Sequence, residues 1–277
     1  MFDFSFPHFS GALSWAEYAY NLQAANISLD FIDAHTLSQR LGVYAQELPT
    51  VLLLPQSYSS LPSYLESLAK IYISSKGKTE THAWEALLPY KRAVLLPVAP
   101  TTGQALDVEE IVFSIKSAYS YFEIALDITF LLGVEPFYFD LWQIDIAFCY
   151  LDNQSYLWAF SQTAEPTLAP ALSPAFQYDY LPQRWNRNRR RALEFRDFLK
   201  QNGFMTPSAF LQTFAFTIFS FPSSVSVSYF ADRLEEKGWL LPTVSQEGLL
   251  LSHLPAHYER SIIPLQNTLM QMIAELC

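Results

Sequence analysis

Cysteine and charged residues are scarce in this sequence, and each shortage excludes a class of protein. The 277 residues include only two cysteines, Cys149 and Cys277, so the chain encodes neither a disulfide framework nor a cysteine-based zinc site. A reducing cytoplasm is the compartment that this usage predicts. Charged residues make up 16% of the chain and hydrophobic residues 51%, a composition that favours a large core and an apolar contact with a partner subunit.

Positive charge and long apolar runs are scarce as well. The formal net charge is −10 and the isoelectric point is near 4.9, and we therefore expect no nucleic-acid partner, since phosphate binding needs a dominant basic field. The longest apolar stretch, residues 124–139, is interrupted by Asp127, Glu135 and Pro136, so no membrane span is expected. Asp3 stands where a signal peptide needs a basic residue, and no targeting segment is expected.

The order of the expected elements predicts an α/β fold: a large domain with a mainly parallel sheet, followed by a small α+β domain. Buried strands are expected at residues 51–54, 71–74, 93–98, 122–126, 144–150 and 156–160, and helices at 14–25, 33–41, 61–69 and 108–117. Strands that are apolar throughout indicate a parallel sheet covered on both faces. The proline-rich residues 162–182 predict a linker, which divides the chain into residues 1–182 and 183–277.

The second part is expected to begin with a basic helix at residues 185–201. Strands at 213–221 and 249–252 and helices at 227–237 and 259–276 are expected beyond it. Its basic patch consists of Arg184, Arg187, Arg189, Arg190, Arg191 and Arg196. The patch could bind RNA, a phosphate-bearing ligand or an acidic protein surface, and the interpretation that we favour is a solvated or partner-facing side of the helix.

Two histidines have the spacing of a metal site. His253 and His257 are four residues apart, which on a helix would place both on one face. Pro255 lies between them and no third ligand is evident, so we favour a polar loop before the last helix.

A hydroxyl-rich turn follows the first buried strand. Ser57, Ser59 and Ser60 precede the helix expected at residues 61–69, where a helix N-terminus could bind a phosphate group. The alternative is an ordinary helix cap, for which such hydroxyl-rich turns are common.

Several segments together resemble fold-type I enzymes that depend on pyridoxal phosphate (PLP), particularly class V aminotransferases and kynureninase-like lyases. They are the turn Thr101-Thr102-Gly103-Gln104, the helix after it, the strand that ends at Asp127, and Asp145-Ile146-Ala147-Phe148. Residues 230–242 are similar to the small-domain helix and strand of these enzymes. The resemblance spans roughly residues 40–275 and implies a shortened large domain of PLP-transferase type.

The resemblance also implies where a cofactor would bind. In the family, the aspartate at the end of this strand pairs with the pyridine nitrogen of PLP, and Asp127 stands at that position. Ser57, Ser59, Ser60 and Thr102 are the other vestigial candidates for cofactor contact. Asp127 could equally cap a following helix.

The sequence departs from the family at its catalytic lysine. That lysine should follow the strand at residues 144–150, but the chain there reads Leu151-Asp152-Asn153-Gln154-Ser155. The lysines of the chain are Lys70, Lys76, Lys78, Lys91, Lys116, Lys200 and Lys237. The family's arginine for the substrate carboxylate is also missing from residues 248–252. Because the lysine holds the cofactor covalently and moves the substrate proton, we expect no catalytic residue and a loss of ordinary PLP chemistry.

Three functional hypotheses follow. The first is a catalytically degenerate scaffold or subunit, with no cofactor expected, that forms a homodimer or a heterodimer with a related subunit. The second is an enzyme with altered chemistry that binds PLP non-covalently, or another phosphorylated small molecule, between residues 57–60 and Asp127, with Tyr150, Asp152 or Tyr156 as acid–base groups. The third is an aminotransferase that uses an unaligned lysine such as Lys91 or Lys200.

Overall fold

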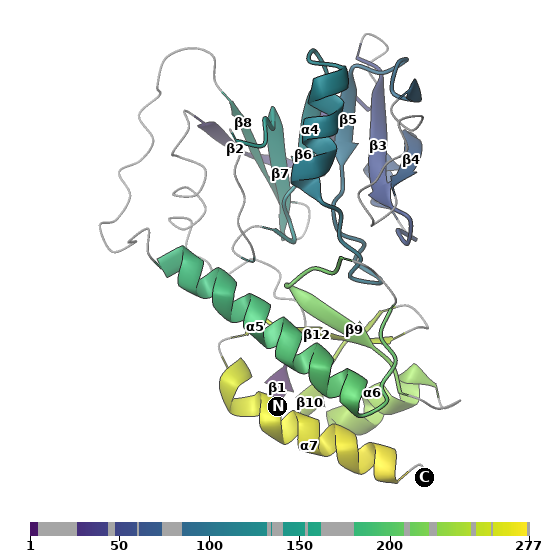
Figure 1. Cartoon of the computed structure of the whole chain (residues 1–277), viewed down its shortest axis with the longest axis vertical. Coiled ribbons are helices and arrows are strands. Elements are labelled where there is room, and N and C mark those ends of the chain that lie inside the picture. The colour runs from purple at the N-terminus through teal and green to yellow at the C-terminus, as the bar shows by residue number, and fades with distance from the viewer. Residues whose placement is uncertain are drawn as a thin grey trace.

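The computed structural model places a large sheet domain above a smaller domain in the view of Figure 1. It describes residues 1–4, 27–43, 48–59, 61–73, 85–131, 134, 141–152, 155–161, 180–207, 211–221, 226–244, 248–255 and 257–275. The helix expected at residues 14–25, residues 162–179 of the expected linker, Ser60 and Cys277 lie outside these ranges. None of the helices in the described ranges is long and apolar enough to cross a bilayer.

The large domain is built on a seven-stranded sheet with the order β2-β8-β7-β6-β5-β3-β4. Its strands are β2 (Ile27–Asp33), β3 (Thr50–Pro55), β4 (Ala69–Ile73), β5 (Arg92–Leu95), β6 (Glu123–Asp127), β7 (Ile146–Asp152) and β8 (Ser155–Ser161). Five neighbouring strands, β4, β3, β5, β6 and β7, pair in parallel, whereas β8 is antiparallel to both β7 and β2. The predicted α/β fold with a mainly parallel sheet is confirmed.

Both faces of this sheet are buried, as continuous apolar strands require. On β3, Val51 and Leu53 pack in the same cluster as the buried side of helix α4 (Val108–Ala118), while Leu52 and Leu54 pack in a second cluster. Helix α2 (Ala34–Arg40) contributes Leu37 to that second cluster. The alternation follows from the two-residue period of a strand. Local caps begin both helices, because Asp33 accepts a hydrogen bond from the Thr36 amide and Asp107 accepts one from the Glu110 amide.

The helix predicted at residues 61–69 is wrong. The chain forms only a single 3₁₀ turn, η1 (Ser63–Leu65), before β4 begins at Ala69. Long-range pairing accounts for the end of the segment: Ala69 is the parallel partner of Val51 on β3, so the last residue of the expected helix lies on a strand.

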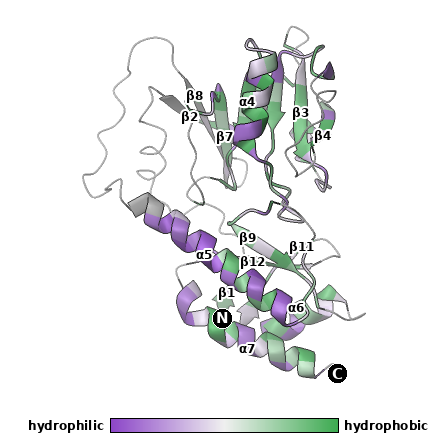
Figure 2. Ribbon diagram, in the orientation of Figure 1, coloured by the Kyte–Doolittle hydropathy of each residue, from purple (hydrophilic) through white to green (hydrophobic). Residues whose placement is uncertain are grey.

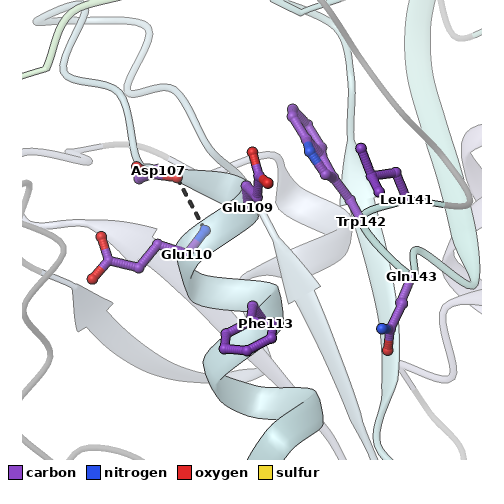
Figure 3. A pocket seen from close by; sticks show the side chains of 7 residues that line it. All are labelled: Asp107, Glu109, Glu110, Phe113, Leu141, Trp142 and Gln143. Atoms are coloured by element: carbon purple, nitrogen blue, oxygen red, sulfur yellow. Dashed lines mark hydrogen bonds between the residues drawn. The ribbon is translucent and has the colours of Figure 1, made fainter.

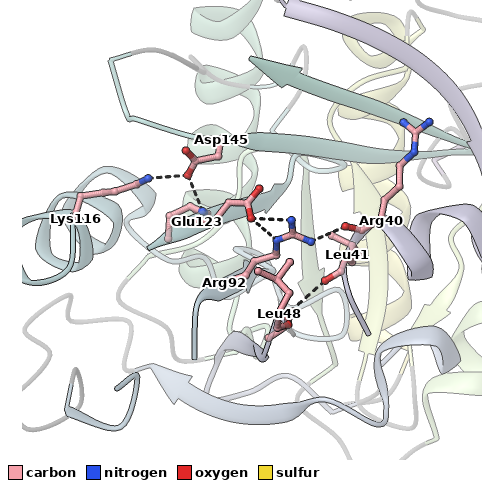
Figure 4. Close-up of polar contacts among 9 residues, drawn as sticks. Arg40, Leu41, Leu48, Arg92, Lys116, Glu123 and Asp145 are labelled. Atoms are coloured by element: carbon pink, nitrogen blue, oxygen red, sulfur yellow. Dashed lines mark hydrogen bonds and ion pairs between the residues drawn. The ribbon is translucent and has the colours of Figure 1, made fainter. Parts of the chain in front are cut away.

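Ion pairs hold the amino edge of the sheet, where β5, β6 and β7 begin (Figure 4). Arg92 donates from Nε and Nη2 to Oε2 of Glu123, at 2.9 and 2.7 Å, and from Nη1 to the backbone carbonyl of Arg40. Beside this pair, Lys116 Nζ lies 2.7 Å from Oδ2 of Asp145. The polar groups at this edge therefore satisfy one another.

The small domain combines helices with short strands. Its elements are α5 (Tyr180–Gln201), β9 (Phe216–Phe219), α6 (Val227–Glu236), β10 (Trp239–Leu240), β11 (Thr243–Val244), β12 (Gly248–Ser252) and α7 (Tyr258–Ala274). Strands β11, β12 and β9 form an antiparallel sheet. The N-terminal strand β1 (Phe2–Asp3) pairs in parallel with β10, and Phe4 is buried in the core of this domain.

Candidate functional site

The predicted site residues lie where parallel strands of the large sheet end. Ser57 follows β3, Thr102 follows β5, and Asp127 is the last residue of β6. Because β3, β5 and β6 are parallel neighbours, their carboxyl ends meet at one edge, the place where α/β proteins usually bind ligands.

The hydroxyl groups after β3 and β5 contact each other directly. Ser57 Oγ lies 2.7 Å from Thr102 Oγ1, and Ser59 Oγ lies 3.0 Å from Thr101 Oγ1. Gln104 completes the cluster, because its Oε1 accepts hydrogen bonds from the amide and the hydroxyl of Ser57. Sequence reasoning included Gln104 in the turn but missed this role, which depends on a contact between residues 47 positions apart.

This cluster lacks the two features that favour a phosphate group. The predicted helix N-terminus after the hydroxyl turn is wrong, since η1 is a single 3₁₀ turn. The Ser57 amide already donates to Gln104, and the hydroxyls of Ser57 and Ser59 contact neutral side chains. The cluster thus offers neutral donors without a cationic side chain among the contacts that the structure describes.

Asp127 sits in a local turn that orients its carboxylate. Its Oδ1 accepts hydrogen bonds from the Thr129 amide at 2.9 Å and from the Thr129 hydroxyl at 2.5 Å. Thr129 Oγ1 in turn accepts a hydrogen bond from the Tyr150 amide on β7. Burial raises the pKa of Asp127 to about 6, and the two Thr129 hydrogen bonds oppose that change. A turn rather than a helix follows at residues 129–131, so Asp127 is not a helix cap.

Tyrosines gather around Asp127. The rings of Tyr64 and Tyr150 both make edge contacts with Tyr156, with centroids 5.6 and 5.4 Å apart respectively. Burial first, and then the negative charge of Asp127, raise the pKa of Tyr58 and of Tyr64 above the usual range. These hydroxyls therefore stay protonated, as hydrogen-bond donors beside a carboxylate. Sequence reasoning named Tyr150 and Tyr156 but missed Tyr58 and Tyr64, for which the only local signal was the hydroxyl-rich turn.

No lysine of the described ranges lies with Asp127 at the carboxyl edge. Lys91 precedes β5 and Lys116 pairs with Asp145, both at the amino edge. Lys200 and Lys237 lie at the C-terminal ends of α5 and α6 in the small domain. Lys70 is the second residue of β4, on the outer strand of the sheet. Lys76 and Lys78 lie outside the described residues.

The β7–β8 connection, where the family carries its lysine, is a tight antiparallel hairpin. Tyr150 pairs with Tyr156, and Asp152 pairs with Ser155. The residues between the tyrosines are Leu151-Asp152-Asn153-Gln154-Ser155, so the hairpin carries no amine for a covalent link to PLP. Asp127 thus stands at the end of β6, where the resemblance implies the pyridine partner, and the hairpin sequence supplies no amine for the covalent link that the resemblance also implies.

The two histidines differ in burial, since His253 lies in the small domain core and His257 is half-buried. His253 is fully buried, and one ring nitrogen lies 2.8 Å from Thr217 Oγ1. Burial holds its pKa well below the usual range, which keeps the ring neutral. His253 lies in the connection between β12 and α7, as expected, but its side chain is buried. Across the ranges that the structure describes, no three side chains form a metal-binding group.

The arginine run of α5 divides into buried and exposed members. Arg191 is buried, and it donates from Nε to Glu259 at 2.9 Å and from Nη1 to the carbonyl of His253 at 2.8 Å. Arg196 is half-buried and donates to Thr217 Oγ1 at 3.1 Å. The expected place on a solvated or partner-facing side is wrong for these two arginines, because their hydrogen bonds join α5 to α7 and β9 within the small domain. Arg189 and Arg190 are exposed.

Comparison with known proteins gives structural matches only: no family model and no curated protein sequence matches the chain. The aspartate aminotransferase of Thermus thermophilus superposes with a TM-score of 0.67 at 13% identity, covering 95% of this chain and 92% of that enzyme. The alanine–glyoxylate aminotransferase of Nostoc sp. gives 0.68 at 13% identity, over 92% and 84% of the two chains.

A third structure in this group contains two kinds of chain. The complex of SepCysS with the N-terminal domain of SepCysE gives a TM-score of 0.66 at 12% identity, over 97% of this chain and 93% of the matched one. At these identities the likeness concerns the fold. The chain therefore has the fold of the PLP-dependent class V aminotransferases.

Proposed function

We propose that this chain is a catalytically degenerate protein of the PLP-transferase fold that acts as a non-catalytic subunit or scaffold. The observation that carries the proposal is that Asp127 lies at the end of β6 while the β7–β8 hairpin has no lysine. Among the described residues no amine lies at this edge, so neither the covalent link to PLP nor the usual proton transfer has a residue there to perform it. The framework of the fold remains, so an assembly role is the function that it supports best.

The expected partner is a second copy of the chain or a related subunit in the cytoplasm. Large exposed apolar side chains on the large domain, among them Phe113, Tyr121 and Leu141, support a protein contact. One of the similar structures is itself a complex between two different proteins. The net charge of −10 supports a protein partner over a nucleic acid.

The test is a titration of the purified protein with PLP, followed by visible absorption, borohydride reduction and intact-mass analysis. We expect the spectrum of free PLP and no covalent adduct. An authentic aminotransferase of this fold, treated in parallel, is the positive control. A shifted absorption band together with an adduct mapped to one lysine would contradict the proposal and would restore the aminotransferase hypothesis, including its versions with Lys91 or Lys200.

A second candidate function is an enzyme with altered chemistry that binds PLP, or another phosphorylated ligand, non-covalently. The observation that favours it is the place of the buried Asp127 carboxylate, whose pKa burial raises to about 6, beside the partly buried side chains of Tyr58 and Tyr64. Equilibrium dialysis with PLP would compare the parent with Asp127→Ala. A parent that binds PLP with the same affinity as Asp127→Ala would rule out this placement of the ligand.

A further inference from the structure

A groove lies between helix α4 and the segment of residues 141–143 (Figure 3). Its volume is about 310 Å³, and we call it the α4 groove. The lining residues are Asp107, Glu109, Glu110, Phe113, Leu141, Trp142 and Gln143. Figure 3 shows Glu109 and Phe113 along the α4 side, with Leu141 and Trp142 on the opposite side.

The α4 groove has apolar walls that are open to solvent. Phe113 is 69% exposed and Leu141 is 70% exposed, and both line the same groove. Apolar side chains gathered in one exposed place mark a contact surface more often than isolated ones do. The buried side of α4 consists of other residues, Val108, Ile111, Val112 and Ile115, so packing on the sheet does not explain Phe113.

The rim of the α4 groove is acidic. Asp107, Glu109 and Glu110 contribute carboxylates, and no lining residue is cationic. Asp107 caps α4 through the Glu110 amide at 3.0 Å, and acidic residues in a first turn favour the helix dipole. Helix stabilisation accounts for the acids but leaves the apolar walls beside them unexplained. A complementary partner would present arginine or lysine next to an apolar side chain.

This chain carries such a surface on α5. Asn186, Arg189, Arg190 and Leu193 are exposed and follow the spacing of one helix face, and we call them the α5 stripe. Leu193 is 46% exposed. Among the described residues, Arg190 forms ion pairs at 3.8 Å with Glu194 and at 3.5 Å with Glu259. Exposed ion pairs of this length are weak, so the guanidinium can also bind a carboxylate of a second chain.

The two surfaces are arranged so that a symmetric pair can use both. Helices α4 and α5 lie on the same face of the molecule in Figure 1, and Figure 2 shows the hydrophilic character of the N-terminal half of α5. In a twofold dimer, the groove of each copy would receive the stripe of the other, so the contact would occur twice. Two such contacts bring the assembly closer to the roughly 800 Å² per partner that stable interfaces bury.

We propose that a second copy of this chain docks its α5 stripe into the α4 groove and that the reciprocal contact completes a twofold dimer. This inference rests on the proposed function, in which the chain acts as a subunit. Leu193 would pack between Phe113 and Leu141, and Arg189 and Arg190 would pair with Glu109 and Glu110 across the interface. The attraction between these charges would weaken as salt is added.

Charge reversal tests the contact on the full-length chain. One variant carries Glu109→Lys and Glu110→Lys, and the other carries Arg189→Glu and Arg190→Glu. By sedimentation velocity, each variant alone is expected to dissociate about tenfold or more readily than the parent, because both contacts then oppose like charges. An equimolar mixture is expected to regain the dimer, because both contacts of the heterodimer again join opposite charges.

The matched control is Asp232→Lys with Glu235→Lys, two exposed positions of α6 that change the net charge by the same amount as the groove variant. This control is expected to dimerise like the parent. A parent dimer that both reversals leave intact would overturn the proposed contact while leaving the subunit function standing, and a monomeric parent would also overturn the contact. Recovery in the mixture guards against misfolding as the cause of dissociation, and a covalent PLP adduct would separately overturn the proposed function.

Discussion

Arg92 donates two hydrogen bonds to a single carboxylate oxygen of Glu123, and its third donor group reaches the backbone carbonyl of Arg40. The guanidinium is only 8% exposed, whereas Glu123 is 32% exposed. One side chain thus joins β5, β6 and the end of α2 at the amino edge of the sheet, opposite the edge that holds Asp127.

Replacing Arg92 with methionine should destabilise the fold strongly. The change leaves a partly buried carboxylate and a carbonyl without their donor, a loss worth about 2–4 kcal/mol in the free energy of unfolding. Arg40→Met is the matched control, since the Arg40–Asp30 pair is 36% and 44% exposed and should contribute about 1 kcal/mol or less. Urea denaturation of both variants measures the difference. Equal losses would show that burial of the Arg92 pair adds nothing.

Asp127→Asn should remove a pH dependence of stability. The folded pKa of Asp127, about 6, lies above the ordinary value of 3.8, so the folded state holds the proton more tightly and stability falls as pH rises from about 4 to about 6. Asparagine keeps an oxygen for the Thr129 donors and carries no charge. Relative to the parent, the variant should gain about 3 kcal/mol at pH 7.5 and only about 0.5 kcal/mol at pH 4, measured by urea denaturation. A difference that does not change with pH would contradict the burial of this carboxylate.

His253→Gln should show the opposite trend. Burial first, and then the charges of Arg196 and Arg191, hold the pKa of His253 well below 6.5, so its contribution is intact above that pH and is lost on acidification. Glutamine can retain a hydrogen bond to Thr217. Between pH 7.5 and pH 5 the variant should gain stability relative to the parent, read from thermal or urea melts. If the parent and the variant lose stability in parallel, His253 is not the titrating group.

Gly248→Ala should disturb the small sheet. A Cβ at this position would lie 2.9 Å from Ile218 Cγ2 and 2.9 Å from the carbonyl oxygen of Phe219, both on the neighbouring strand β9. Overpacking of this kind costs about 1–3 kcal/mol. Gly203→Ala is the control for backbone strain, because Gly203 has a φ of +75° and no atom within 4 Å of the added carbon, which predicts a cost of about 1 kcal/mol. A smaller loss at Gly248 than at Gly203 would contradict the steric argument.

The parts of the fold that the sequence predicts are those with local signals. Asp33 and Asp107 stand before apolar residues at helical spacing, and both are N-caps in the structure. The apolar runs that became β3, β5, β6 and β7 predict a parallel sheet because burial on both faces leaves no polar alternation. The missing lysine is likewise a property of the sequence alone.

The sequence predictions that were wrong or incomplete concern residues whose structure depends on contacts with distant parts of the chain. The segment after Ser60 has helical composition, but the pairing of Ala69 with Val51 overrides it. Tyr58 and Tyr64 approach Asp127 only once β3 and β6 share an edge, so no local pattern marks them. The same holds for Arg191, whose partners Glu259 and His253 lie more than 60 positions along the chain.

The pairing of β1 with β10 has a consequence for how the small domain folds. Phe2 and Trp239 are register partners, and their rings stack with centroids 5.1 Å apart. A contact between residues so distant in sequence closes a very long loop, and such contacts slow folding. During synthesis, β1 cannot pair with β10 until Trp239 has left the ribosome. A fragment that begins at Tyr180 would contain every helix of the small domain and still lack Phe4, a buried member of its core.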